Sequence, residues 1–367
     1  MHPYRALAEL PQKRSRGLKV ARTDCEAVLN FLRERDLIVR GLRILRFGCS
    51  SVVPVARQLS TDEAAGLTSD GITFEEAEVD FPALETRPRS LLEYLGDKLP
   101  SDLLASVPRS YDIIGDIAIV ELPHELGNYR ALVGEAAMNV HRRLRLVLNK
   151  TSAITGKFRV GKYEIIAGQG PTETLHREHG CIYKLDPTKV FFTPRLSTER
   201  ARVASQVNGG EAVGDLFAGV GPFSILIART VPGVKVYSID INPFAFRYLE
   251  ENIRLNGVEG KAFAILGDAA EVAESELKGI CNRVIMNMPA GSELFLKAAS
   301  SALLPEGGIV HLHVFVDGLE SLKGRTAMIE ERMRMFGWKG VSTSQTRLIR
   351  EVGVRSYHVA IDISLNK

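Results

Sequence analysis

Short apolar runs alternate with helix-length segments over the C-terminal part of the chain, from about Leu196. The regular alternation predicts a parallel sheet with helices on both faces. After a helix near Leu319–Phe336, two strand patterns at Val341–Leu348 and Ser356–Ile363 follow without a helix between them, which predicts a closing antiparallel hairpin. The preceding strand candidates are Ala212–Phe217, Lys235–Ile239, Ala262–Leu266, Arg283–Met288 and Ile309–Phe315.

The middle of the chain has a different pattern. Tyr111–Leu122 is rich in β-branched residues and predicts a strand, whereas apolar positions recurring every three or four residues predict a helix over Tyr129–Leu148. A polar, proline-punctuated stretch at residues 81–90 separates this region from a first one. We therefore predict domains at residues 1–85, 86–195 and 196–367. Further strands are predicted at Tyr163–Ala167, Cys181–Leu185 and Lys189–Phe192.

The composition is that of an ordinary globular protein and sets few limits on function. Apolar residues make up 45% and charged residues 25% of the 367 positions, and a net charge of +3 permits a polyanionic partner without requiring one. No apolar run approaches the roughly 18–20 residues that span a bilayer, and Met1–Arg5 lacks the apolar stretch of a signal peptide. Cys25, Cys49, Cys181 and Cys281 are scattered, as expected for reduced thiols. We expect a cytoplasmic protein without a membrane partner.

A glycine-containing loop, Asp215–Phe223, follows the first predicted strand of the third domain. Gly219 and Gly221 permit a tight turn and a close backbone approach to a ligand. Asp240 ends the second predicted strand, where a carboxylate can accept both ribose hydroxyls, and Asp268 ends the third, where an adenine amino group is often held. Three carboxylates at three successive strand ends indicate a nucleoside-containing cofactor.

The same loop is a poor match for a dinucleotide. Ser224 stands at the third glycine position of the dinucleotide fingerprint, and Pro222 removes a backbone N–H that a pyrophosphate would use. Asp215 would repel a diphosphate but suits the cationic end of a sulfonium amino acid. The pattern therefore favours S-adenosylmethionine over NAD.

The fourth predicted strand ends in Met286-Asn287-Met288-Pro289. In the S-adenosylmethionine fold this position faces the methyl group of the cofactor. An Asn-x-Pro turn there offers amide and carbonyl groups to the edge of a planar, amide-like substrate. The motif favours a base as the methyl acceptor.

Several further segments carry a family resemblance: Ser110–Asp116, Thr174–Gly180, Phe191–Arg200, Asn287–Pro289 and Val354–Val359. With them the chain resembles the tRNA (guanine-37 N1)-methyltransferases of archaea and eukaryotes over about residues 110–367, whereas residues 1–80 match only loosely. Pro194-Arg195-Leu196-x-x-Glu199 is the most specific match. The resemblance implies an α/β, class I methyltransferase with a Rossmann-like seven-stranded sheet and an antiparallel last strand. An α+β RNA-binding domain and a small N-terminal domain would precede it.

The resemblance also implies residue roles in methyl transfer from S-adenosylmethionine to N1 of guanine 37. Glu199 matches the general base, Arg159 the cation that holds guanine O6, and Asn287 the residue that positions the base. These roles suit the chemistry, because N1 carries a proton at neutral pH and charge develops on O6 when that proton leaves. Phe191 stands where the family often has tyrosine. The predicted cofactor contacts are Asp215, Phe217, Gly219, Gly221, Asp240, Ile241, Asp268, Ala269, Asn287, Phe191 and Arg195.

Basic residues gather near the end of the predicted helix in the second domain and favour contact with phosphates. By resemblance, the second and third domains would enclose the anticodon arm of the tRNA, and the N-terminal domain would read its outer corner. A monomer is expected. The predicted RNA contacts are Arg142, Arg143, Arg145, Lys150, Pro194 and Pro289.

Other functions stay open at this point. A wyosine-pathway enzyme of the same architecture would transfer the aminocarboxypropyl group of the same cofactor. A second rival would methylate the tricyclic wyosine precursor in addition to guanine 37. A non-catalytic RNA-binding module and an NAD-dependent oxidoreductase fit the intact cofactor loop less well. His176, His179 and Cys181 have no complementary pair elsewhere in the chain, so no metal is expected.

Overall fold

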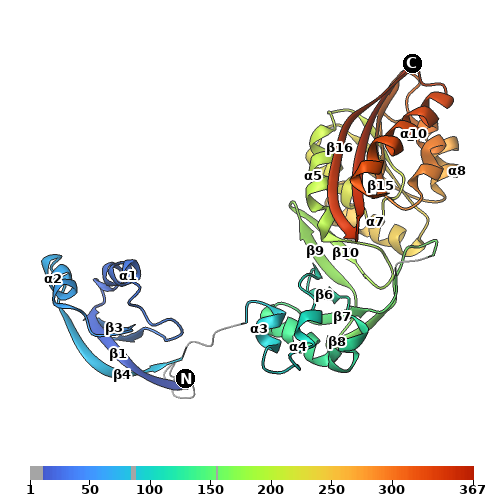
Figure 1. The fold of residues 1–367 in the computed structure, drawn as a ribbon. Helices are drawn as coiled ribbons and strands as arrows, with labels where there is room; N and C mark the ends of the chain where they lie inside the picture. Colours follow the sequence, from blue (N-terminus) through green and yellow to red (C-terminus); the bar gives the residue numbers. More distant parts are fainter. Residues whose placement is uncertain (1–10, 84–87, 154–155) are drawn as a thin grey trace. The chain divides into compact units, whose positions relative to one another are not determined.

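A computed structural model describes residues 11–83, 88–153 and 156–367 of the chain. These residues form two compact units, Met1–Pro88 and Arg89–Lys367, and each is described separately below (Figure 1). Among the described residues no helix combines the length and the apolar character needed to cross a membrane.

The N-terminal unit is a four-stranded antiparallel sheet in the order β2-β3-β1-β4 with two helices. Ser60 caps the second helix: its side chain accepts a hydrogen bond from the backbone N–H of Glu63, and the Glu63 carboxylate accepts one from the backbone N–H of Ser60. Leu18, Val53 and Leu67 are buried in its core. The elements are β1 (Gln12–Ala21), α1 (Cys25–Glu34), β2 (Leu45–Phe47), β3 (Ser50–Val55), α2 (Thr61–Ser69) and β4 (Phe74–Pro82).

The C-terminal unit begins with a four-stranded sheet in the order β5-β6-β7-β8, on which helix α4 packs. Val133, Ala136 and Ala137 of α4 are buried against Val120 and Val147 of the sheet. The elements are α3 (Leu91–Leu95), β5 (Asp112–Ile114), β6 (Ile117–Val120), α4 (Arg130–Val140), β7 (Leu146–Lys150) and β8 (Tyr163–Gly168), with 3-10 helices η2 (Leu104–Ser106) and η3 (His124–Tyr129).

Three sequence predictions for this region are wrong. Tyr111–Leu122 is a hairpin of two strands rather than one strand, because the chain reverses at Gly115, which has φ 58°. The helix predicted over Tyr129–Leu148 ends at Val140, and residues 146–150 instead pair with β6 and β8. A short apolar run is buried equally well as a helix or as a strand, and here pairing with both neighbours decides. Lys189–Phe192 is a turn and loop, not a strand.

A hairpin of β9 (Thr174–Glu178) and β10 (Cys181–Leu185) follows, with left-handed backbone at His179 and Gly180. The side chains of Asn252 and Asn256 bond to the backbone of β10 and thereby attach the hairpin to helix α7 (Pro243–Leu255).

The remaining strands form the seven-stranded sheet that the sequence predicts, in the order β13-β12-β11-β14-β15-β17-β16. β13, β12, β11, β14 and β15 are parallel, whereas β17 is antiparallel to both β15 and β16, which confirms the closing hairpin. The strands are β11 (Ala212–Asp215), β12 (Lys235–Asp240), β13 (Ala262–Leu266), β14 (Arg283–Met286), β15 (Gly307–Asp317), β16 (Gly340–Gly353) and β17 (Ser356–Asn366).

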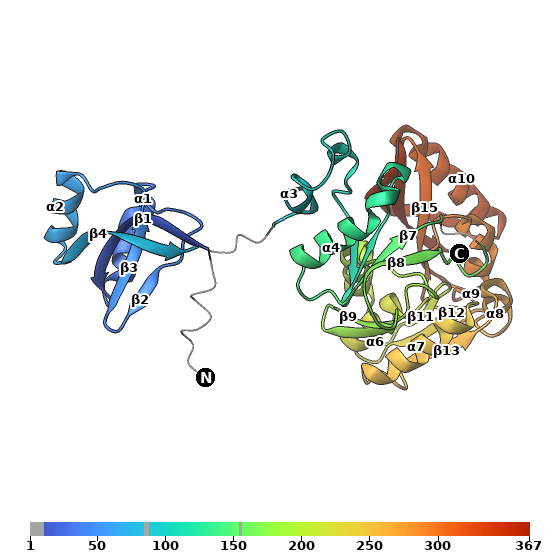
Figure 2. The same ribbon diagram turned by 90° about the horizontal axis from the view of Figure 1, so that it is seen from below.

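Helices cover both faces of this sheet (Figures 1 and 2). Residues of α5, α6 and α7 share one apolar core with β11 and β12, and residues of α8, α9 and α10 share another with β14, β15 and β17. This arrangement places the strand ends, and the loops that follow them, along one edge. The helices are α5 (Ser197–Gln206), α6 (Pro222–Thr230), α7 (Pro243–Leu255), α8 (Ala269–Ser275), α9 (Leu296–Ala302) and α10 (Leu322–Met335), with 3-10 helices η4 (Pro194–Leu196), η5 (Ser292–Phe295) and η6 (Leu319–Ser321).

Candidate active site

A cavity of about 480 Å³ lies at the carboxyl ends of β11, β12, β13 and β14. Its volume falls within the ~300–1,000 Å³ that is usual for small-molecule sites. Ligands of open parallel sheets bind at this edge, because the loops that follow the strands meet there. Predicted site residues that line the cavity are Arg159, Phe191, Phe217, Gly219, Asp240, Ile241, Asp268, Ala269, Asn287 and Pro289.

Backbone geometry explains the two loop glycines. Gly219 and Gly221 have φ values of 56° and 89°, which residues with a side chain rarely adopt. Gly219 lines the cavity, and a Cβ at this position would lie 3.8 Å from the nearest atom. The absence of a side chain therefore leaves space in the cavity at this point. Gly221 lies behind the lining, where a Cβ would come within 2.5 Å of Leu249. The first glycine therefore leaves room for a ligand and the second lets α6 pack.

The strand-end carboxylates have two kinds of environment. Asp240 and Asp268 line the cavity. Asp240 accepts hydrogen bonds from the backbone N–H groups of Gly219 at 2.7 Å and Asn242 at 2.8 Å, and burial raises its pKa. Asp268 caps α8 by accepting from the backbone of Ala270 at 2.9 Å. Both oxygens of Asp240 keep a second lone pair for a ligand hydroxyl.

Asp215 differs from these two carboxylates because it is fully buried and does not line the cavity. Burial raises its pKa to about 7, and Ser224 donates a hydrogen bond to one of its oxygens at 2.7 Å. The other oxygen has no hydrogen-bond partner among the described residues. Asp215 therefore lies behind the cavity lining, and its contact with the cofactor stays a prediction.

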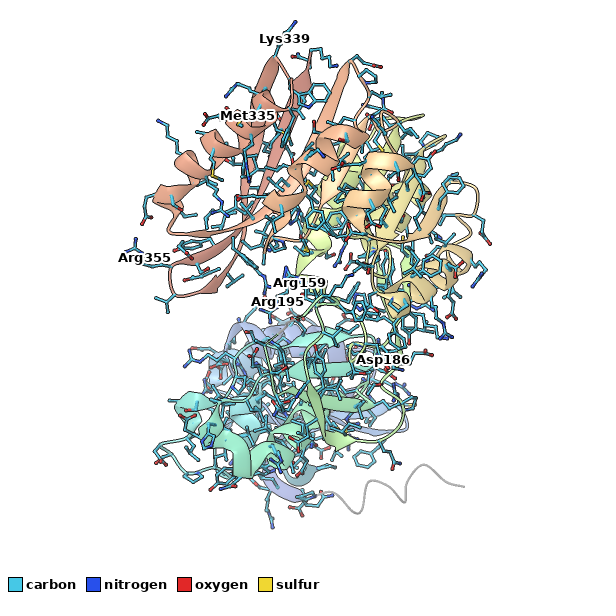
Figure 3. The ribbon with its side chains drawn as sticks, turned by 90° about the vertical axis from the view of Figure 1, so that its right-hand side faces the viewer. Arg159, Asp186, Arg195, Met335, Lys339 and Arg355 are labelled. Carbon is cyan, nitrogen blue, oxygen red and sulfur yellow. The ribbon has the colours of Figure 1, made fainter. Side chains whose placement is uncertain are left out.

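Two of the three predicted catalytic residues face the cavity. Asn287 reaches it from the end of β14, and Arg159 from the loop before β8. Arg159 has φ 57°, and its guanidinium donates to the carbonyl of Ala290 at 2.9 Å, directly after the Asn-x-Pro turn. Arg159 and Arg195 lie at the level where the β5–β8 region meets the seven-stranded sheet (Figure 3). The guanidinium of Arg159 and the side-chain amide of Asn287 therefore both line the cavity near the end of β14.

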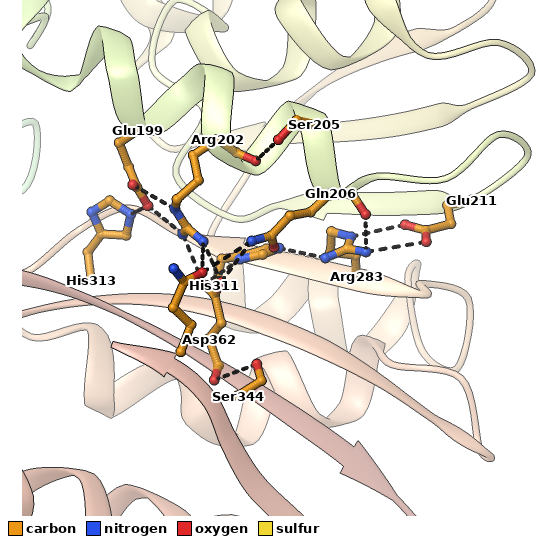
Figure 4. A network of polar contacts seen from close by, with 11 residues as sticks. Glu199, Arg202, Ser205, Gln206, Glu211, Arg283, His311, His313, Ser344 and Asp362 are labelled. Carbon is orange, nitrogen blue, oxygen red and sulfur yellow. Dashed lines mark hydrogen bonds and ion pairs between the residues drawn. The ribbon is translucent and has the colours of Figure 1, made fainter. Parts of the chain in front are cut away.

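Glu199 lies outside the lining of the cavity and is only 2% exposed. Both of its oxygens accept from the guanidinium of Arg202, at 2.6 and 2.8 Å, and His313 lies 3.6 Å away on β15 (Figure 4). Although burial opposes ionisation, the hydrogen bonds from Arg202, together with the nearby His313, hold the pKa of Glu199 at about 2. The residue is therefore a firmly ionised carboxylate.

The buried polar network extends beyond Glu199 and Arg202 (Figure 4). Arg202 also binds Asp362 on β17, at 2.5 and 3.0 Å, and Asp362 pairs with His311 at 2.7 Å. His311 in turn contacts Arg283 at 2.8 Å. Such a chain of charges fixes the position of α5 on the sheet, because breaking any one pair would leave its partner buried and unpaired.

The predicted RNA contacts fall into two groups. Arg142 and Arg143 are exposed in the turn after α4. Arg145 is held instead by Asp116 at 2.8 and 3.2 Å and by two backbone carbonyls, and Lys150 is paired with Glu121 at 3.0 Å. The sequence had placed both residues at the end of a helix, but α4 already ends at Val140.

Two other predicted contacts lie outside the cavity lining. Arg195 is bound to Asp112 at 2.5 Å, and Pro194 starts the 3-10 helix η4. The histidines that raised the question of a metal have protein partners: His176 accepts from the backbone of Gly115, and His179 contacts Ser197. Within residues 11–83, 88–153 and 156–367, no group of three His, Cys, Asp or Glu side chains is placed to hold a metal ion.

Sequence reasoning missed the side chains that reach the cavity from the antiparallel edge of the sheet. His358 on β17 and Phe315 on β15 lie opposite each other in the register, and Arg350 reaches the cavity from β16. Only the strand pairing shows that these positions meet the cofactor loop. Other unpredicted lining residues are Lys157, Phe158, Phe192, Thr193, Leu196, Arg200, Leu216, Ala218, Pro222, Phe223, Asn242, Ala245, Gly267, Met288, Ala290 and Phe295.

The strand order, the antiparallel β17 and the cavity at the strand ends define a class I methyltransferase fold. Residues 174–337 match the TRM5/TYW2 methyltransferase domain, and residues 91–172 match the TYW2 N-terminal domain. The chain belongs to the TRM5/TYW2 methyltransferase family.

Relatives in this family carry more than one activity in their names. The chain is 41% identical to the tRNA (guanine(37)-N(1))-methyltransferase Trm5b of Pyrococcus abyssi over 80% of this chain and 85% of that one. It is 32% identical to the tRNA(Phe) (4-demethylwyosine(37)-C(7)) aminocarboxypropyltransferase of Methanocaldococcus jannaschii, over 70% of this chain and 98% of that one. A solved complex of aTrm5 and tRNALeu is 30% identical with a TM-score of 0.80, covering 95% of this chain and 99% of that one.

Proposed function

We propose that this protein transfers the methyl group of S-adenosylmethionine to N1 of guanine 37 in tRNA. The observation that carries the proposal is a single cavity with carboxylates for a nucleoside at one end and Arg159 with Asn287 at the other. The high identity to a relative named for this reaction, over most of both chains, supports it.

The residues of the cavity suit S-adenosylmethionine. Asp240 would accept the ribose hydroxyls, and Asp268, where the loop after β13 lines the cavity, would lie by the adenine. Gly219 leaves the space that the cofactor needs, and Phe191 and Phe217 offer apolar surface. When bound, the cofactor supplies an electrophilic methyl group and a neutral thioether leaving group.

The base would lie against the end of β14. Asn287 would hold the edge of the guanine, and Arg159 would stabilise the negative charge that forms on O6 when N1 loses its proton. The freed N1 electron pair would then be directed at the methyl group that the bound cofactor supplies, with the neutral thioether as the leaving group. Arg159 is well suited to this role because the guanidinium stays charged at any working pH.

Glu199 is the proposed general base, the carboxylate towards which the N1 proton moves. It is ionised, as a base must be, but it lies behind the cavity wall rather than in it. The proton therefore needs a route through the groups that separate Glu199 from the cavity.

The proposed partner is the anticodon arm of the tRNA. The exposed Arg142 and Arg143 are suited to phosphate contacts, and Pro289 lies beside the proposed base site. In this proposal residues 86–195 form an RNA-binding domain before a methyltransferase domain at 196–367. Residues 1–85 form a domain that reads the outer corner of the tRNA, and the protein acts as a monomer.

Parallel reactions with methyl-labelled and carboxyl-labelled cofactor test this function. Unmodified tRNA should take up the methyl label alone, and nucleoside mass spectrometry should find 1-methylguanosine at position 37. Uptake of the carboxyl label would instead identify aminocarboxypropyl transfer, and the proposal would fail. Methylation of a wyosine precursor but not of guanine would also contradict it.

A further inference from the structure

Two buried histidines connect the cavity to Glu199. His358 lines the cavity, and its Nε2 lies 2.9 Å from Nδ1 of His313. The Nε2 of His313 lies 3.6 Å from a carboxylate oxygen of Glu199. His313 is fully buried, and its Nε2 has no closer partner among the described residues. The three side chains thus form a line from the cavity wall to the ionised carboxylate.

The carboxylate decides which nitrogens carry protons. An ionised Glu199 only accepts, so it favours the His313 tautomer with a proton on Nε2. Nδ1 of His313 then has a lone pair and accepts from Nε2–H of His358. This leaves a lone pair on Nδ1 of His358, the ring nitrogen that does not take part in the contact with His313. In the catalytic triads of hydrolases a carboxylate likewise fixes the tautomer of a histidine. Here a second histidine ring extends the arrangement.

The surroundings of His358 keep its ring neutral. Burial is the main cause that lowers the pKa of His358 to about 3, and the nearby charge of Arg350 adds to it, whereas the Glu199 carboxylate works in the opposite direction. The Phe315 ring packs edge-on against the His358 ring, with 5.5 Å between the ring centroids. A neutral ring of low basicity is poorly suited to keeping a proton but well suited to passing one on.

We propose that His358 takes the N1 proton of the guanine and passes its own Nε2 proton to His313, whose positive charge Glu199 then balances. This inference rests on the function proposed above. In the step, the guanine N1–H bond breaks and His358 Nδ1–H forms, while His358 Nε2–H breaks and His313 Nδ1–H forms. The guanine becomes an anion held by Arg159, and His313 becomes an imidazolium beside Glu199. His358 ends the step neutral, with its tautomer reversed.

Single-turnover methylation by the full-length His358→Gln variant tests the relay. The glutamine amide keeps a contact at the Nε2 position but cannot relay a proton, so the rate should fall by about 10²-fold or more. The affinities for S-adenosylmethionine and tRNA should not change, because the proposed role of His358 is proton transfer and not the binding of either ligand. His124→Gln, an exposed histidine outside the cavity, is the matched control and should methylate at the wild-type rate.

Two further measurements separate a relay from a structural role. His313→Asn should lower the rate as much as His358→Gln, and the double variant should be no slower than either, because both residues serve one path. Rates of the wild type in H₂O–D₂O mixtures should depend on deuterium content along a curve, since two protons move together. A straight line would mean that one proton moves and would overturn the relay.

The outcomes for the relay and for the proposed function are distinct. A wild type that makes 1-methylguanosine together with a fully active His358→Gln variant would overturn the relay and leave the function standing. A wild type that makes none would remove both. If His358→Gln does not fold, as judged by loss of cofactor binding, His313→Asn and the wild-type isotope curve decide.

Discussion

Replacing Glu199 by glutamine should destabilise the seven-stranded domain by an amount that the structure lets us calculate. The pKa of Glu199 falls from 4.5 to about 2 on folding. At about 1.4 kcal/mol per pKa unit, the ionised carboxylate contributes about 3 kcal/mol to the free energy of unfolding at neutral pH. Loss of one partner from a buried ion pair commonly costs a similar amount, about 3–5 kcal/mol.

The pH dependence has a definite sign. A carboxyl group with a lowered pKa in the folded state stabilises the protein fully above its unfolded value of 4.5, and this contribution is lost as the pH falls towards about 2. The free energy of unfolding of the wild type should therefore decline more steeply below about pH 5 than that of Glu199→Gln. The difference between the two proteins should be largest at neutral pH.

Trp338 provides the assay, because it is the one tryptophan of the chain and is only 5% exposed, in the core shared by α10 and the sheet. Its fluorescence during urea unfolding reports on the C-terminal unit, Arg89–Lys367. Glu331→Gln, at an exposed position of α10, is the control and should change the free energy of unfolding by less than about 0.5 kcal/mol. Equal stability of wild type and Glu199→Gln at pH 7, with equal slopes on acidification, would refute the assignment of Glu199 as a firmly ionised, paired carboxylate.

Three further changes test the cavity. Arg159→Ala should lower the single-turnover methylation rate by about 10²–10³-fold with little change in cofactor affinity by calorimetry; an unchanged rate would exclude the O6 contact. Asp240→Ala should weaken cofactor binding by about 10–100-fold, because a hydrogen bond to a charged group contributes about 1.5–3 kcal/mol; unchanged binding in calorimetry would place the ribose elsewhere. Gly221→Ala should destabilise the domain by about 1–3 kcal/mol in Trp338-monitored unfolding, because its Cβ would lie 2.5 Å from Leu249 at a φ of 89°. Wild-type stability of that variant would show that the loop adjusts.

The features that the sequence predicted correctly arise from local patterns and a general topological rule. The alternation of strand and helix signals gave the parallel strands, and the absence of a helix before Ser356 gave the antiparallel hairpin. Parallel strands end along one edge, so Asp240, Asp268 and Asn287 had to come together once each was placed at a strand end. Their convergence needed no knowledge of side-chain packing.

The features that the sequence did not predict depend on pairing over long distances. His358 reaches the cavity only because β17 runs antiparallel to β15, with His358 opposite Phe315. The apolar run at residues 144–148 had no local signal that separated a strand from the end of a helix, and its pairing with β6 and β8 decided the outcome. Likewise, the burial of Glu199 behind the cavity follows from its pairing with Arg202 and Asp362 across the sheet, which no spacing in the sequence indicates.

Methylation of two tRNA transcripts that differ only at position 37 tests the central claim most directly. The protein is incubated with methyl-labelled S-adenosylmethionine and a transcript carrying guanine or adenine at this position, and the digested nucleosides are identified by mass spectrometry. The guanine transcript should yield labelled 1-methylguanosine and the adenine transcript no labelled nucleoside. Equal labelling of both transcripts, or label in any nucleoside other than 1-methylguanosine, would contradict the account.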